Sequence, residues 1–583
     1  MSVIREERAP PPAPGLSPHA ALGSRQAPTR AHALIVAALC AVAFSIELRF
    51  AQLWHFGFDE TWHVSIAAVE PFQQFVEELR WDSHPPFFLL LLRWLTPLHG
   101  SELSPRLVSM LASLGTILLA YFCALEIALS RPVALLAALL FAVSSTHLNV
   151  AICVRGYSLS TMLTMAAFLC FLRILRDPAA AGHTDRLGFV LAALLAIWSE
   201  SCAAFVVLAA LAVFLLEVLR RPGLLRALWR GDGLWARWTE PLVLFLGAGV
   251  FLGWLQWNRA TGFVGHVSDG FRAKGEPLAQ FAVRGFTATL DTFAPLGLSS
   301  TRVSPLVSGL FLAVLGWLAL RYARSISASG RLRASVILII VQVWAAIFLL
   351  ATREIYPYGG RMRHQFVLFP FLAFVLLLVL DEVYRWLRAT PLRVLLCVAF
   401  AAGTVATSLD GLGRGPVEEF SPTPTLWADE IGGLLHERQQ DDAIYATEID
   451  TIGVFSHLRD YRWTLRQTGP DRLDLFTLEE EGSPPIQVLR ESSVWWPPAP
   501  LDAAFATRLA GSLRRCGIKT AWVVALTLEP RPSILERSDD EPTRALLAAE
   551  GLDLDRRIVF ESGEVLRVVC REAGSAIVQA SIP

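Results

Sequence analysis

The sequence predicts a polytopic α-helical membrane protein with about eleven transmembrane helices and a C-terminal extracytoplasmic α/β domain. Hydrophobic residues make up 54% of the 583 residues and charged residues only 18%, which is too apolar for an ordinary soluble chain. Apolar runs of membrane-spanning length recur up to about residue 410. Beyond residue 420 the composition turns polar, and strand-like segments alternate with helix-like ones.

Residues 1–30 are rich in Pro, Ala and Arg, a composition typical of disordered segments. The run His32–Leu48 that follows is long enough to begin a span. It has no small-residue cleavage pattern before a polar mature region, so it does not look like a cleaved signal peptide. We therefore expect residues 1–30 to be a disordered cytoplasmic tail.

The arginines between the apolar runs give the orientation of the bundle. Short cytoplasmic loops are enriched in Lys and Arg, and with the N-terminus inside, all the short Arg-rich loops fall on one side. An odd number of spans then places the C-terminus outside. The predicted spans 187–200 and 202–219 meet at Glu200, where little room is left for a turn. The transmembrane domain is predicted over residues 31–410, with spans at roughly 33–53, 107–128, 133–150, 158–174, 187–200, 202–219, 240–257, 305–322, 334–351, 365–381 and 393–409.

Three outer segments are longer than a connection requires: 54–106, 258–304 and 352–364. The first contains a helix-like stretch over Thr61–Arg80 and then Phe87–Leu95, an apolar run too short to span. Paired prolines immediately before that run favour the start of a helix. We therefore expect interfacial helices within the 54–106 loop.

Residues 420–583 are predicted to form the outer α/β domain, with a helix over Thr425–Gln439 and strands at Ala443–Thr447, Thr520–Leu526 and Val565–Cys570. This part has no glycine-rich phosphate loop, so no nucleotide site is expected there. Cys516 and Cys570 lie in this domain. They could pair in an oxidising compartment or remain two separate thiols, and the sequence favours neither.

The net charge and the spacing of the cysteines argue against several classes of partner and cofactor. The formal net charge is −1, so no overall field favours a nucleic acid. None of the eight cysteines forms a metal-type or redox-type spacing. We expect no cofactor and no tightly bound metal, since no residue pattern supports a divalent ion.

Asp59 and Glu60 are adjacent carboxylates just after the first span, flanked by Phe58 and Trp62. A carboxylate near an apolar surface has a raised pKa unless a cation pairs with it, which suits a general base. Adjacent helical residues point about 100° apart, so at most one of the two aims at a reacting atom. The alternative is that both are ordinary solvated loop carboxylates.

Basic and hydrogen-bonding residues recur on the same outer side. His84 precedes the paired prolines, where the N-terminus of a helix favours an anion. Arginines this close to the apolar slab are costly unless they pair, snorkel or bind an anion, and Arg is suited to bidentate phosphate recognition. The alternatives are a helix cap for His84 and lipid-headgroup contacts for the arginines. The predicted phosphate-binding residues are His84, Arg106, Arg155, Tyr157, Arg361, Arg363 and His364.

The order of these residues resembles the GT-C superfamily of integral membrane glycosyltransferases, in particular the bacterial branch of protein O-mannosyltransferases and the lipid A aminoarabinose transferase. Asp59-Glu60 stands where that family has an acidic motif in the first outer loop, and His84-Pro85-Pro86 where it has a basic residue before paired prolines. Ser104-Pro105-Arg106-Leu107 and Arg155-Gly156-Tyr157 match its next two segments. Arg361-Met362-Arg363-His364 resembles its late basic segment.

The resemblance implies transfer of a sugar from a polyprenyl-phosphate carrier to a lipid, glycan or protein acceptor, with inversion, at the outer face of a bacterial inner membrane in the cell envelope. Asp59 would deprotonate the acceptor with Glu60 as its partner. His84, Arg155, Arg361 and Arg363 would bind the lipid phosphate.

The chain departs from the family at two positions. Many relatives have an acidic residue where Cys153 stands, and a Lys where His84 stands. The first difference argues against a second carboxylate and a shared metal, and it also suits a non-catalytic homologue. A flippase or transporter of lipid-linked sugars is the other alternative, although transporters place ionisable residues near mid-membrane and show related halves.

Overall fold

The structure is a computed structural model of the 583-residue chain. It describes residues 29–53, 58–69, 72–79, 84–95, 103–177, 181–221, 276–292, 305–323, 327–353, 365–413, 441–447, 462–468, 473–479, 485–491, 503–526, 540–560 and 563–571, with a few isolated residues between these ranges.

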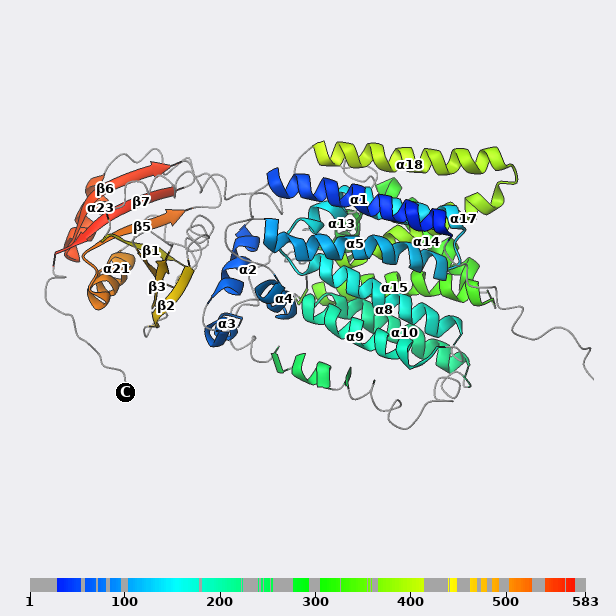
Figure 1. Ribbon diagram of the computed structural model, residues 1–583, viewed down its shortest axis with the longest axis horizontal. Helices are drawn as coiled ribbons and strands as arrows, with labels where there is room; N and C mark the ends of the chain where they lie inside the picture. Colours follow the sequence, from blue (N-terminus) through cyan, green and yellow to red (C-terminus); the bar gives the residue numbers. More distant parts are fainter. Residues whose placement is uncertain are drawn as a thin grey trace, which may run out of the picture.

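The described residues between Arg30 and Gly413 form a helical bundle, as expected for a multi-pass membrane protein (Figure 1). Within the described residues, seven helices are long and apolar enough to cross a membrane, or eight if the bent pair α6–α7 is one span. Its elements are α1 (Arg30–Leu53), α5 (Leu103–Glu126), α6 (Arg131–Val143), α7 (Ser145–Ala151), α8 (Tyr157–Arg176), α9 (His183–Ser199), α10 (Ala203–Arg220), α13 (Leu278–Thr292), α14 (Pro305–Ala323), α15 (Ala328–Ala351), η3 (Phe366–Leu368), α17 (Phe369–Trp386) and α18 (Thr390–Gly413).

The count of eleven spans is not confirmed. The predicted spans 187–200 and 305–322 form α9 and α14, which are not among the seven helices, and 240–257 is described only in isolated residues. The predicted span 133–150 is broken at Ser144 into two helices bent by 54°. The Ser144 side chain accepts a hydrogen bond from the backbone N–H of His147, and this N-cap starts a new helix in place of continuing the old one.

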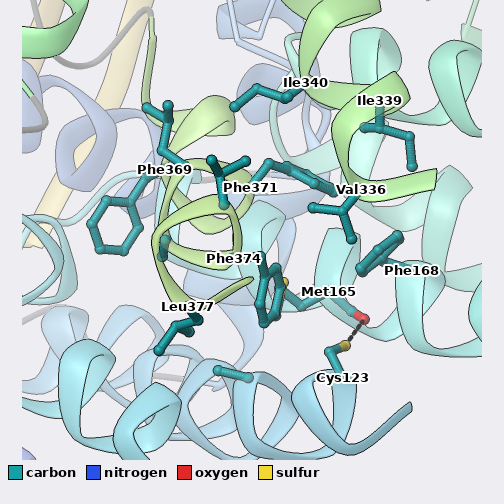
Figure 2. Close-up of a cluster of buried hydrophobic side chains, with 14 of the residues drawn as sticks. Cys123, Met165, Phe168, Val336, Ile339, Ile340, Phe369, Phe371, Phe374 and Leu377 are labelled. Carbon is teal, nitrogen blue, oxygen red and sulfur yellow. Dashed lines mark hydrogen bonds between the residues drawn. The ribbon is translucent and has the colours of Figure 1, made fainter. Parts of the chain in front are cut away.

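Aromatic and aliphatic side chains from four helices form the centre of the bundle (Figure 2). Phe371 and Phe374 of α17 meet Phe168 of α8, with ring centroids 5.2 and 6.2 Å apart. This tight packing fixes α17, and with it η3, against α8, because core side chains leave few voids to move into. Figure 2 labels Cys123 of α5, Met165 and Phe168 of α8, Val336, Ile339 and Ile340 of α15, and Phe369, Phe371, Phe374 and Leu377 of α17.

Three short helices cover one end of the bundle, where interfacial helices were expected (Figure 1). They are α2 (Phe58–Ala68), α3 (Phe72–Glu78) and α4 (Phe87–Leu95). The stretch Thr61–Arg80 is therefore two helices, and Pro71 lies between them in the sequence, where its ring disfavours a continuous helix. Arg93 of α4 donates to the carbonyls of Ala67 and Val69 at 2.8 and 2.6 Å. This guanidinium caps the C-terminus of α2 and ties α2 to α4.

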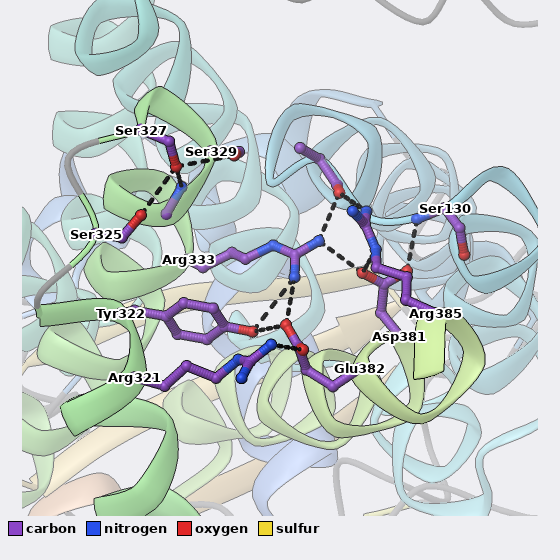
Figure 3. Close-up of polar contacts among 12 residues, drawn as sticks. Ser130, Arg321, Tyr322, Ser325, Ser327, Ser329, Arg333, Asp381, Glu382 and Arg385 are labelled. Carbon is purple, nitrogen blue, oxygen red and sulfur yellow. Dashed lines mark hydrogen bonds and ion pairs between the residues drawn. The ribbon is translucent and has the colours of Figure 1, made fainter. Parts of the chain in front are cut away.

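At the opposite end, a buried ion-pair network joins α14, α15, α17 and the α5–α6 link (Figure 3). Arg333 donates to Asp381 at 2.6 Å, to Glu382 at 2.8 Å and to the Ala128 carbonyl at 2.7 Å. Asp381 is fully buried and also accepts from the Ser130 N–H at 2.8 Å. Arg333 is the buried cation that Asp381 and Glu382 share, so removing it takes a charged partner from both carboxylates.

We expect the substitution Arg333→Met to lower the free energy of unfolding by about 3–5 kcal/mol, since it breaks a buried charge pair and leaves Asp381 buried. The matched control is Arg321→Met, because Arg321 pairs with the same Glu382 from an exposed position. Its effect should stay below about 1 kcal/mol. Denaturant titration of the purified protein in detergent measures the free energy of unfolding of both variants. Equal losses would contradict the role of Arg333 as the buried cation of the network.

The C-terminal part contains a seven-stranded sheet of order β2-β3-β4-β1-β5-β7-β6. β1 pairs in parallel with β4 and β5, and the remaining pairs are antiparallel. The sheet lies beyond the end of the bundle that α2, α3 and α4 cover (Figure 1). Its elements are β1 (Ala443–Thr447), β2 (Arg462–Thr468), β3 (Leu473–Glu479), β4 (Ile486–Glu491), α21 (Ala503–Cys516), β5 (Thr520–Leu526), α23 (Asp540–Ala549), β6 (Leu552–Phe560) and β7 (Gly563–Cys570).

The strands expected at 443–447, 520–526 and 565–570 correspond to β1, β5 and β7. The helix expected at 425–439 lies almost wholly outside the described residues. Phe505 and Leu509 of α21 are buried against Tyr445 and Val523 of the sheet, which gives this part its own core. Cys516 and Cys570 are free thiols, so of the two alternatives the structure has the separate thiols.

Candidate functional site

Glu60 anchors α2 to the turn between α7 and α8. Its side chain accepts a hydrogen bond from the Val154 N–H at 2.8 Å, and the residue is only 5% exposed. Arg106, at the start of α5 and 1% exposed, lies with its Nε 3.7 Å from the same carboxylate oxygen. Arg106 also donates to the Ala51 carbonyl at 2.7 Å near the end of α1. The pair therefore joins four segments of the chain at one buried point.

His63, three residues after Glu60 on α2, holds the same turn from the other side. Its Nδ1 lies 3.0 Å from the Val154 carbonyl oxygen. Because a carbonyl can only accept, Nδ1 carries the proton. The His63 ring also meets the His84 ring edge to face, with centroids 5.1 Å apart. Sequence reasoning did not single out His63, although it lies at the end of the acidic stretch.

Arg155 is the centre of the basic group. The residue is 4% exposed, and its Nη2 donates to His84 Nε2 at 2.9 Å and to the Tyr157 hydroxyl at 3.1 Å. A guanidinium can only donate, so the Nε2 lone pair of His84 accepts this bond. The guanidinium also lies over the Tyr157 ring, 5.4 Å from its centroid. Three predicted residues, His84, Arg155 and Tyr157, are thus in direct contact.

Glu200 joins this group from the link between α9 and α10. Its carboxylate lies 3.8 Å from His84 Nε2. Sequence reasoning treated Glu200 only as an obstacle to a turn between two spans. An acidic residue inside an otherwise apolar stretch was the available indication, because such residues are costly unless they face the interior and serve a purpose.

Tyr356 brings the 352–364 segment to the same place. Burial raises the pKa of its phenol well above the ordinary value, and the nearby Cys202 and Glu200 raise it further. The Tyr356 ring packs against Phe205 of α10 at 5.0 Å. This tyrosine stays protonated at neutral pH and can donate a hydrogen bond.

Gly156 allows the Arg-x-Tyr turn to approach α9. A β-carbon at this position would lie 2.3 Å from the Ser199 carbonyl oxygen, well inside contact distance. The absence of a side chain therefore lets Arg155 and Tyr157 lie beside Glu200. Close backbone approach is a common reason for a glycine at a site.

The substitution Gly156→Ala should cost about 1–3 kcal/mol of stability by overpacking and reduce activity at this site at least about tenfold by moving the turn. Gly403 of α18 is the control, because nothing lies within 4 Å of its added β-carbon and Ala is the better helix former. Gly403→Ala should be neutral or slightly stabilising. An active, fully stable Gly156→Ala variant would show that close approach is not required.

A small pocket of about 10 Å³, with room for about one water molecule, lies against this group. Its polar wall comes from α8 and the α9–α10 link, and its apolar wall from η3 and α17. The residues that line it are Tyr157, Ser160, Thr161, Thr164, Glu200, Cys202, Phe366, Val367 and Pro370.

Four predicted site residues are not placed by these contacts. Asp59 lies in α2, but its side chain is outside the described set, and Arg361, Arg363 and His364 lie outside the described residues. Gln365 follows directly and is buried, and Phe366 lines the pocket. Of the predicted residues, the structure therefore brings together Glu60, His84, Arg106, Arg155 and Tyr157.

Cys153 occupies the position where an acidic residue was noted as missing. Its thiol donates to the Asn149 carbonyl at 3.1 Å within the bend after α7. Within the part of the chain that the structure describes, no group of three His, Cys, Asp or Glu side chains could hold a metal ion. The absence of a metal remains a prediction.

A family model for dolichyl-phosphate-mannose-protein mannosyltransferase matches residues 83–230. This region includes His84, Arg106, Arg155, Tyr157 and Glu200. No curated protein matched the sequence.

Among solved structures, the chain is similar to ArnT from Cupriavidus metallidurans in two states. With undecaprenyl phosphate bound, the identity is 15%, the TM-score 0.53, and the match covers 93% of this chain and 98% of ArnT. In the apo state the TM-score is 0.54 at the same identity, with 92% and 98% covered.

The chain has the fold of a GT-C membrane glycosyltransferase. It resembles the O-mannosyltransferase and ArnT branch, as the motif order indicated. A protein O-mannosyltransferase Pmt1–Pmt2 complex of S. cerevisiae bound to its sugar donor also matches at 17% identity. It covers 48% of this chain and 38% of that one with a TM-score of 0.30, too low to support further argument.

Proposed function

We propose that this chain transfers a sugar from a polyprenyl-phosphate donor to an acceptor at the extracytoplasmic face, with inversion at the anomeric carbon. The observation that carries the proposal is the contact among His84, Arg155 and Tyr157 beside a pocket at one end of a membrane bundle. The family match over 83–230 and the ArnT fold support it. ArnT itself was solved with undecaprenyl phosphate, the kind of carrier proposed here.

The basic group suits the leaving phosphate. When the bond between the anomeric carbon and the phosphate oxygen breaks, that oxygen gains negative charge, which a preorganised cation stabilises. Arg155 is buried and held by His84 and Tyr157, so it needs little rearrangement. We assign Arg361, Arg363 and His364 to the same phosphate, because Tyr356 and Phe366 on either side of them lie at the site.

Asp59 is the proposed base. Glu60 anchors α2 on Val154 and lies beside Arg106, so its carboxylate is engaged in holding the helix. Adjacent helical residues point about 100° apart, so Asp59 points away from the contacts of Glu60. We therefore assign the contact with the acceptor to Asp59. Asp59 would take the proton of the acceptor group as that group attacks the anomeric carbon opposite the departing phosphate.

We infer the side of the membrane on which the acceptor reacts from the place of the C-terminal sheet and from the arginine distribution. The sheet lies beyond the end of the bundle that carries α2, α3 and α4 (Figure 1), and the arginine distribution predicts that this end is extracytoplasmic. A lipid, glycan or protein acceptor would therefore meet Asp59 outside the cytoplasm. No nucleotide sugar is required, since a polyprenyl carrier supplies the activated sugar.

The test uses the full chain in liposomes with a set of polyprenyl-phosphate sugars and added acceptor lipids, glycans or peptides. Formation of a glycosylated product together with free polyprenyl phosphate is the expected result. Movement of the lipid-linked sugar across the bilayer without release of the sugar would instead identify a flippase. Binding without either process would identify a non-catalytic homologue.

A further inference from the structure

His84 lies between a cation and an anion beside α2. Its Nε2 accepts a hydrogen bond from Arg155 Nη2 at 2.9 Å and lies 3.8 Å from the Glu200 carboxylate. Among the residues that the structure describes, two further titratable groups face the ring. They are His63 of α2 and Tyr157 of α8, whose ring centroids lie 5.1 and 6.3 Å from that of His84. One nitrogen of His84 therefore meets charges of both signs.

His84 is also the member of this set whose charge can change near neutral pH. Histidine is the side chain that ordinarily titrates between about pH 5 and 8. The His84 side chain is 19% exposed, so protons reach it from solvent. His63, by contrast, is 1% exposed, and its Nδ1–H is bound to the Val154 carbonyl. The proton that comes and goes at this point is therefore carried by His84.

A proton on Nε2 of His84 reverses both of its charged contacts. In the neutral ring Nε2 is an acceptor, so it holds the Arg155 guanidinium, which can only donate. A protonated Nε2 is a donor, so it can no longer accept from Arg155 and forms a charged hydrogen bond with Glu200 in its place. Arg155 keeps its bond to the Tyr157 hydroxyl at 3.1 Å. The N–H that it gave to His84 becomes available to an incoming anion.

The same proton changes the charge of the site. With a neutral His84 the charges of Arg155 and Glu200 cancel, whereas a protonated His84 leaves one net positive charge to meet a lipid phosphate. We propose that His84 is a proton-linked switch. In its neutral state it holds Arg155, and in its protonated state it pairs with Glu200 and releases Arg155 to the phosphate. The inference rests on the proposed function. The proton and the phosphate then favour each other's binding.

The test is the affinity of the full chain in nanodiscs for the methyl ester of undecaprenyl phosphate, measured between about pH 5 and 8. This probe is a phosphodiester, which keeps a single negative charge over that range, so a change of affinity with pH arises in the protein. The wild-type affinity should rise about tenfold or more as the pH falls, because protonation adds a positive charge and supplies the phosphate with an Arg155 donor.

Two substitutions of His84 separate its charge from its packing. His84→Lys carries a positive charge throughout this range and should show the low-pH affinity of the wild type at every pH. His84→Gln keeps a hydrogen-bonding side chain without the charge, so it should show the weaker high-pH affinity at every pH. Glu200→Gln removes the partner of the imidazolium, and the midpoint of its pH dependence should lie at least about 0.5 pH units lower than in the wild type.

The matched control is His183→Gln. His183 also lies beside a carboxylate, 2.9 Å from Glu240, but it begins α9, and Glu200 follows the other end of that helix. This variant should keep the wild-type pH dependence. A wild-type affinity that does not change with pH, or a pH dependence that persists in His84→Gln, would overturn the switch and leave the proposed function in place. Failure of the wild type to bind the probe at any pH would contradict the proposed function, and the switch with it.

Discussion

Replacing Arg155 with methionine should reduce sugar transfer by about 10²–10³-fold, the usual loss when a preorganised group that stabilises developing charge is removed. Arg155 is buried and held by His84 and Tyr157, so its charge acts in a site largely protected from water. Methionine has a similar length, which limits the change in packing. Single-turnover transfer from a polyprenyl-phosphate sugar measures the effect on the chemical step.

Two variants sharpen this prediction. Arg155→Lys keeps the charge but loses the planar guanidinium, so its rate of sugar transfer should lie between those of the wild type and Arg155→Met. Arg388→Met removes an exposed arginine after α17 and should leave the rate unchanged. If Arg155→Met transferred sugar at the wild-type rate, the phosphate would have to bind elsewhere.

Replacing Glu60 with alanine should lower the free energy of unfolding by about 3–5 kcal/mol, because it leaves the nearly fully buried Arg106 without the carboxylate beside it. The Val154 N–H would also lose its acceptor. We expect the loss in a denaturant titration, together with faster proteolysis of the 54–106 segment, since α2 would no longer be anchored.

The control for Glu60 is Glu77→Ala, which removes an exposed carboxylate from α3 in the same outer segment. That change should stay within about 0.5 kcal/mol. A Glu60→Ala protein as stable as wild type but unable to transfer sugar would instead place Glu60 in the chemistry.

The sequence predicted the helical membrane fold and most of the residues that meet at the site, because the motifs follow one another on the same predicted side. It also located three of the strands, where β-branched and apolar residues are dense. The interruption at Ser144 was missed, because one capping hydroxyl within an apolar run is a weak local feature.

Long-range contacts were the main limit. Arg333 was counted only as a cytoplasmic loop residue, yet it lies within α15 and pairs with Asp381, 48 residues away. Glu200 was noted only as an awkward link, because nothing local indicates that His84 lies beside it. Both residues owe their role to tertiary packing, which spacing along the chain does not reveal.

The most direct test of the proposed mechanism is sugar transfer by Asp59→Asn, measured beside its affinity for the polyprenyl-phosphate sugar. Asparagine keeps the size of the side chain but cannot accept the acceptor's proton. We expect transfer to fall by about 10²–10⁴-fold while donor affinity and stability remain at wild-type values. Undiminished transfer by Asp59→Asn would contradict the assignment of Asp59 as the base.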